Sequence, residues 1–107
     1  MGRFLVLWYQ DPVAPWPTDP SESLKLNERM MGTIADLMKK GEIEEFGFFT
    51  DGTSGYVISK GEAVDIFRRA NMFQPYITVE VHEMIPFEKG REISRAVWEA
   101  KIAAAKT

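Results

Sequence analysis

The sequence predicts a single α+β domain in which short strands alternate with amphipathic helices. Runs rich in aromatic and β-branched residues recur along the chain, and between them apolar residues recur at helical spacing. Proline, glycine and capping residues separate these segments. The chain has 107 residues, of which 45% are hydrophobic and 27% charged. This composition supports one folded domain over residues 1–107 and excludes a disordered chain.

The N-terminal part predicts a strand, a loop and a long helix. Residues 4–9 are apolar at every position, so we expect both faces of this strand to be covered. Residues 10–20 contain four prolines and are expected to form a loop. Asp19 is the expected helix cap, with Pro20 in the first position and Gly41 as the stop. The expected apolar stripe consists of Leu24, Met30, Met31, Ile34, Leu37 and Met38.

A hairpin and a second helix are expected next. Residues 43–50 and 56–59 have the composition of strands, and the intervening segment contains an Asp-Gly turn signal. Ser59 and Glu62 form a capping-box pattern for a helix that ends near Gln74, before a proline. The apolar side of this helix is expected to consist of Val64, Ile66, Phe67 and Ala70.

The C-terminal part predicts a last strand and a last helix. In the strand of residues 77–84, odd-numbered residues face one way and even-numbered residues the other. A helix over about residues 91–106 is expected to follow Gly90. This helix is too apolar to stand free, and it either covers its own sheet or reaches across to a partner. Its apolar residues are Ile93, Val97, Trp98, Ala100, Ile102 and Ala104.

The order of these elements is that of the ferredoxin-like β-α-β-β-α-β arrangement, followed by an extra C-terminal helix. In it, a four-stranded antiparallel sheet carries two helices on one face. Because the other face would expose apolar side chains, we expect a second copy to cover it and form a two-fold homodimer. The side chains expected on that face are Leu or Phe residues of the first strand, Phe46, Phe48 or Phe49, and the row Thr78, Glu80 and His82.

Charge and composition exclude several kinds of partner and site. A net charge of −3 argues against nucleic acid, and no apolar run is long enough to cross a membrane. We therefore expect a cytoplasmic protein. The absence of cysteine and the single histidine, His82, exclude disulfides, cysteine-ligated metal and multi-histidine metal sites. No cofactor motif is present, so we expect no metal and no cofactor; a haem bound by one histidine is the one option left open.

Residues 73–81, with the sequence Phe-Gln-Pro-Tyr-Ile-Thr-Val-Glu-Val, are followed by Pro86 and resemble a segment of muconolactone isomerase-like proteins. Those proteins belong to the dimeric α+β barrel superfamily, which includes isomerases, oxygenases, lyases and domains without known activity. The resemblance implies a barrel formed by two sheets between subunits, rings of dimers in some members, and a pocket between sheet and helices. YCII-related members of this superfamily usually have a histidine in the first helix and an aspartate just before the Pro-Tyr pair. This chain departs from that pattern, because residues 21–40 contain no histidine and Gln74 precedes Pro75.

Glu80 and His82 are the candidate catalytic pair. They stand two residues apart on one predicted strand, so their side chains point to the same face. A histidine that titrates near neutral pH and a partly buried glutamate suit a proton transfer next to a carbonyl. Tyr9, at the end of the first strand, is the candidate donor to a developing oxyanion. The alternative is that the pair forms structural ion pairs, across the dimer interface or with Arg3, Arg68 or Arg69.

Four further residues are candidates for substrate binding. Trp8 and Trp16 flank the proline-rich loop and either wall a pocket for a flat, apolar ligand or merely fix the loop. Tyr56 offers a hydroxyl to a substrate oxygen, and Arg68 completes the set.

Two classes of function remain open. The first is a small cofactor-free isomerase or lyase that moves a proton on a small organic acid or ring compound. The second is a non-catalytic domain for ligand binding or self-assembly. One scaffold supports many functions, so the fold alone does not separate them.

Overall fold

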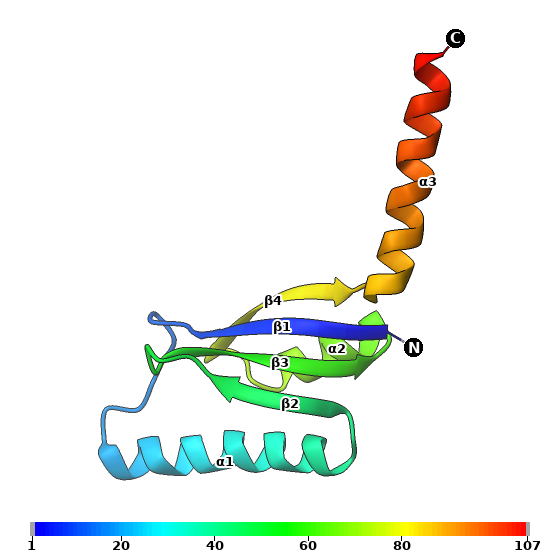
Figure 1. Ribbon diagram of the computed structural model, residues 1–107. Helices are drawn as coiled ribbons and strands as arrows, with labels where there is room; N and C mark the ends of the chain where they lie inside the picture. The colour runs from blue at the N-terminus through cyan, green and yellow to red at the C-terminus, as the bar shows by residue number, and fades with distance from the viewer. Residues whose placement is uncertain (1, 107) are drawn as a thin grey trace.

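The computed structural model describes residues 2–106 and has an α+β arrangement of one four-stranded antiparallel sheet and three helices (Figure 1). The elements are β1 (Gly2–Gln10), α1 (Pro20–Lys39), β2 (Ile43–Phe48), β3 (Ser54–Gly61), α2 (Ala63–Asn71), β4 (Ile77–Met84) and α3 (Phe87–Ala105). Their order along the chain is the predicted one. The strands lie in the order β2-β3-β1-β4, so β1 and β3 are central.

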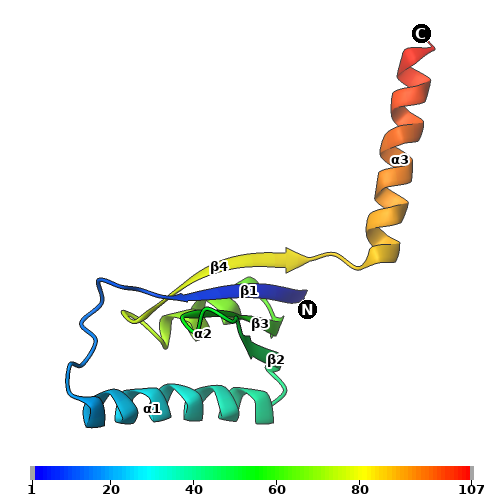
Figure 2. The same ribbon diagram turned by 60° about the vertical axis from the view of Figure 1, so that its left-hand side comes forward.

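The three helices divide between the two sides of the sheet. α1 and α2 lie on one side, whereas α3 leaves the end of β4 and rises away on the other (Figure 2). The side without α1 and α2 is called the open face below. It carries Leu5, Leu7 and Tyr9 of β1, Tyr56 and Ile58 of β3, and Thr78, Glu80 and His82 of β4.

The core lies between the sheet and the two helices that cover it. Phe4, Val6 and Trp8 alternate along β1 toward this side and are buried, and Ile66 of α2 packs with the first two of them. The intervening leucines of β1 are only partly buried, because no element of the described chain covers the open face. Full cover of β1 on both sides is therefore not achieved within one chain.

An irregularity in β2 decides where its aromatic residues point. The register of β2 against β3 shifts near its start, as in a β-bulge, and this changes which side chains face the helices. Phe46 and Phe48 consequently contact Trp8 on the helix side, which corrects their expected place on the open face. Phe49 stacks against Tyr56 and takes the expected position.

The predicted start of α1 is confirmed, whereas the predicted cap of α2 is wrong. Asp19 is the N-cap residue of α1 and Pro20 follows it, although the Asp19 carboxylate makes no cap hydrogen bond and instead accepts one from the Ser21 hydroxyl at 2.7 Å. Ser59 is buried within β3. The capping box of α2 lies three residues later, where Asp65 accepts the backbone N–H of Glu62 at 2.8 Å. The strand continues past Ser59 because its ladder with β1 runs to the end of both strands.

The apolar stripes of α1 and α2 are narrower than predicted. The buried helix residues are Leu26, Ile34, Leu37 and Ile66. Residues predicted for the core but exposed are Leu24, Met38, Val64 and Phe67. Helical spacing permits several adjoining stripes, and contact with the sheet selects one of them. α2 also ends earlier than predicted, at Asn71.

The hairpin between β2 and β3 has Asp51 at its turn. The Asp51 carboxylate accepts hydrogen bonds from the backbone N–H groups of Thr53 and Ser54, at 2.8 and 3.0 Å, and from the Ser54 hydroxyl at 2.8 Å. The Thr53 N–H, followed by the Ser54 hydroxyl, holds the pKa of the Asp51 carboxyl below its usual range. β3 starts at Ser54, two residues before the predicted start.

Replacing Asp51 with alanine is expected to destabilise the protein in a pH-dependent way. The folded-state pKa of Asp51 is lowered, so its stabilisation is fully present above the ordinary aspartate pKa and is lost as the pH falls through the lowered value. Urea unfolding of the wild type and of Asp51→Ala should therefore differ at neutral pH and converge in acid. A difference that stays constant down to the acid limit would contradict this account of the turn.

α3 begins at Phe87 and contains Gly90 as its fourth residue, so the predicted start after Gly90 is wrong. Pro86 precedes the helix with a φ of −59°, a value that suits a helix start. No residue of α3 is buried. The described chain measures 70 × 30 × 25 Å, with a radius of gyration of 19.1 Å against about 13 Å for a compact domain of this size. α3 therefore does not cover its own sheet.

Candidate functional site

A largely apolar cavity lies between the sheet and the two helices that cover it. Its volume is about 80 Å³, and it is partly open to solvent. Apolar side chains of all four strands and of α1 and α2 line it, among them Ile34, Val57 and Ile66. Ser59 and Arg69 are the polar side chains at its edge. The volume is well below the roughly 300–1,000 Å³ of sites for drug-sized ligands, so the cavity suits a smaller molecule.

Trp8 lines this cavity and carries an unused hydrogen-bond donor. Its ring stacks on Phe46, with centroids 5.5 Å apart, and meets Phe48 edge-on at 5.6 Å. The side chain is 6% exposed, and its Nε1 makes no hydrogen bond within residues 2–106. Gly55 makes room for it, because a Cβ there would overlap the Gly47 carbonyl and the Trp8 ring. A buried N–H without an acceptor is unfavourable unless a ligand or water supplies one.

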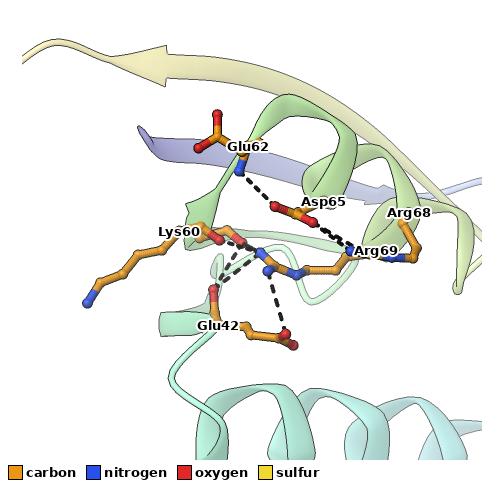
Figure 3. Close-up of polar contacts among 7 residues, drawn as sticks. Glu42, Lys60, Glu62, Asp65, Arg68 and Arg69 are labelled. Atoms are coloured by element: carbon orange, nitrogen blue, oxygen red, sulfur yellow. Dashed lines mark hydrogen bonds and ion pairs between the residues drawn. The ribbon is translucent and has the colours of Figure 1, made fainter. Parts of the chain in front are cut away.

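Arg69 of α2 lines the cavity, and its guanidinium joins three segments of the chain (Figure 3). Its Nη1 donates to Ser59 Oγ at 2.7 Å, to the Lys60 carbonyl at 2.6 Å and to the Glu42 carbonyl at 3.4 Å. The Glu42 carboxylate lies 3.8 Å from Nη2. Only 13% of the Arg69 side chain is exposed. The guanidinium is therefore committed to structural contacts at the cavity edge.

Arg68, a predicted substrate-binding residue, points elsewhere. It forms an ion pair with Asp65 at 2.6 Å on the outer side of α2 (Figure 3). The Glu62 N–H and then Arg68 lower the pKa of the Asp65 carboxyl. The side chain of Arg68 is largely exposed and does not line the cavity.

Glu80 and His82 do lie together, as their spacing on the strand predicts. His82 Nε2 is 2.8 Å from Glu80 Oε2, and both side chains are more than half exposed. Tyr9 belongs to the same open face and is 41% exposed. The sheet separates all three from Trp8, which faces the helices. Within one chain, the candidate catalytic pair and the cavity are therefore on opposite faces.

Tyr56 is also on the open face, where its hydroxyl donates to the Glu45 carboxylate. This hydrogen bond, together with partial removal from water, raises the pKa of Tyr56. Beside it, Glu44 bridges Arg3 at 2.8 Å and Lys60 at 3.2 Å. The polar groups at this edge of the sheet are thus paired with one another.

Trp16 fixes the proline-rich loop to the body of the domain. Its Nε1 donates to the Asp11 carbonyl at 2.6 Å, and its ring lies 5.0 Å from the ring of Tyr76, just before β4. Trp16 does not line the cavity. These contacts are those expected of a residue that fixes the loop, and not those of a pocket wall.

The structure thus divides the predicted site residues among several places. Glu80, His82, Tyr9 and Tyr56 share the open face, Trp8 lines the cavity, and Trp16 and Arg68 lie apart from both. Sequence reasoning missed Arg69 and Ser59. Their signal was weak, because Ser59 matched a helix cap and Arg69 is adjacent to a second arginine, Arg68, in the sequence.

In residues 2–106, no helix is long and apolar enough to span a membrane, and no three potential ligands among His, Asp and Glu gather into a metal site. No protein-family model matches the chain, and comparison with curated proteins finds no match.

Proposed function

We propose that this protein binds a small, mainly apolar molecule that has one hydrogen-bond acceptor, in the cavity between the sheet and α1 and α2. The observation that carries this proposal is the buried Nε1 of Trp8, which has no acceptor within residues 2–106 although its ring lines the cavity. An ether, carbonyl or similar oxygen would satisfy this donor. The apolar remainder of the ligand would contact side chains such as Ile34 and Val57.

Paired probes test whether Trp8 donates to the ligand. Anisole and ethylbenzene have the same number of heavy atoms, but only anisole has an ether oxygen. We expect Trp8→Phe to lower the affinity for anisole relative to ethylbenzene by about two- to tenfold, the equivalent of one neutral hydrogen bond of about 0.5–1.5 kcal/mol. Titrations followed by NMR of the cavity methyl groups measure both affinities. An unchanged ratio would show that Trp8 does not recognise an acceptor.

A second variant tests the location of the ligand. Ala70 lines the cavity, so Ala70→Leu should fill it and weaken the binding of both probes at least tenfold. Ala63 is the exposed first residue of the same helix, and Ala63→Leu is the matched control that should leave binding unchanged. Equal binding by both variants would place the probes outside the cavity.

Self-association through the open face is a second proposed property. The alternation of strands and helices and the strand order β2-β3-β1-β4 are consistent with a ferredoxin-like sheet, and two such sheets packed face to face would form a dimeric α+β barrel. The incompletely covered Leu5, Leu7 and Ile58 favour this arrangement, because burying them releases apolar surface from water. We also propose a cytoplasmic location, which suits a chain without cysteine.

Proton transfer by Glu80 and His82 is the catalytic candidate, and their 2.8 Å contact favours it. Because the pair faces away from the cavity, its substrate would have to lie on the open face, enclosed by a second copy. Enclosure should then remove His82 from water. We expect diethyl pyrocarbonate to modify the His82 ring more slowly in the associated protein than in a variant that cannot associate. Equal rates of modification would leave the pair as a surface ion pair.

A further inference from the structure

α3 carries an open groove on one side. Its lining includes Ile85, Phe87, Gly90, Ser94 and Trp98, together with Arg91 and Arg95. Phe87, Gly90, Ser94 and Trp98 are separated by three or four residues, so they follow one side of the helix. Phe87 is 75% exposed and Trp98 61% exposed. Two large aromatic rings beside a glycine leave a hole of the kind that an opposing side chain fills.

The groove is complementary to itself. Trp98 lies four residues after Ser94, and Gly90 lies four residues before it. If two α3 helices cross antiparallel with a two-fold axis at Ser94, each Trp98 ring faces the Gly90 of the other copy. A Cβ built on Gly90 meets no atom within 4 Å, so the space there is free to receive the ring.

A cation–aromatic contact agrees with the same register. Lys101 lies over the Trp98 ring of its own helix, 4.5 Å from its centroid, and the axis places it opposite Phe87 of the other copy. Arg91 and Arg95 also line the groove, and Arg95 is already paired with Glu99 of its own helix at 2.9 Å.

We propose that α3 is an association arm that pairs antiparallel with α3 of a second copy of this chain, with Trp98 of each copy seated over Gly90 of the other. The two-fold symmetry makes the contact isologous and closed. The contact is separate from the proposed packing of the open faces and does not depend on it. Where both contacts form, one protomer meets a partner through its sheet and a partner through its arm.

A single cysteine tests the position of the axis in a chain that has none. Helices that pack about 8–10 Å apart bring facing Cα atoms to about 4–5 Å, near the range that a disulfide bridges. We expect Ser94→Cys to form a covalent dimer under mild oxidation, seen on a non-reducing gel. Ala103→Cys, on the far side of the helix, is the control and should stay monomeric on the same gel. Equal cross-linking of the two variants, or none, would overturn the proposal.

Gly90→Leu tests the aromatic contact without weakening the helix, because leucine favours a helix more than glycine does. In the Ser94→Cys background it should reduce cross-linking at least tenfold, whereas Ala103→Leu should leave it unchanged. Persistent cross-linking after Gly90→Leu would overturn the proposed register. The same cysteine in a Leu7→Lys background should still cross-link, because the open face is not involved. If Leu7→Lys alone abolished the cross-link, the arm would be acting only within a sheet-paired dimer.

Discussion

Arg69→Met is expected to lower the free energy of unfolding by about 2–4 kcal/mol. Methionine keeps the apolar contact with the cavity but removes the donors that serve Ser59, Lys60 and Glu42. A hydrogen bond from a charged group contributes about 1.5–3 kcal/mol, and a buried acceptor left without a partner adds about 1–3 kcal/mol. Urea unfolding followed by circular dichroism measures the change.

The neighbouring arginine provides the control for this prediction. Arg68 makes a single ion pair with Asp65 and is largely exposed, so Arg68→Met should change the stability little. Both variants remove one positive charge from α2, which makes the comparison independent of net charge. If the two variants unfold at the same urea concentration, the contacts of Arg69 at the cavity edge do not stabilise the fold.

Leu7→Lys is expected to abolish association through the open face. Leu7 lies on the central strand β1, between Tyr56 of β3 and Glu80 of β4, at the middle of the proposed contact. A lysine there would have to lose its hydration against the same lysine of a second copy, which costs far more than a leucine contact contributes. The measurement is sedimentation equilibrium in the Gly90→Leu background, where the arm contact is removed. The expected change is from a dimer to a 12.2 kDa monomer.

Val64→Lys is the matched control for the open face. Val64 is 69% exposed on α2, on the other side of the sheet, so the same gain of charge should leave the mass unchanged there. A dimer that survives Leu7→Lys but not Val64→Lys would place the contact on the helical side. A Gly90→Leu protein that is already monomeric would refute association through the open face.

The order of elements was predictable because each element has its own local signal. Pro20 and Gly41 mark the start and end of α1, and the Asp-Gly pair at residue 51 marks the hairpin. The side to which each residue of β1 and β4 points follows from strict alternation. These features depend on neighbours in the sequence, so a single sequence contains them.

Features that depend on distant contacts were not predictable. The shift in β2 turned Phe46 and Phe48 toward the helices, because one extra residue in a strand reverses every later side chain. Ser59 was read as a cap because its spacing from Glu62 fits one, although the ladder with β1 keeps it in a strand. Local patterns do not show which of two competing hydrogen-bond arrangements forms.

The candidate site was predictable only in part. The pairing of Glu80 with His82 follows from their spacing, and Trp8, a candidate for substrate binding, lines the cavity. These two features lie on opposite faces of the sheet because the even-numbered residues of β1 face the helices, whereas the even-numbered residues of β4 face away from them. The register between β1 and β4, which pairs residues 67 to 81 positions apart, decides this relation.

The two-residue joint between β4 and α3 determines the rotation of α3 about its own axis as well as its direction. Only Ile85 and Pro86 connect the two elements, and proline restricts the backbone of both residues. Insertion or deletion of one residue in this joint would rotate the whole helix by about 100° about its axis, because each residue of an α-helix turns by that angle. The groove of Gly90 and Trp98 would then point in another direction. Length in this joint is therefore a stricter requirement than residue identity, and length changes are better tolerated in the hairpin turn than here.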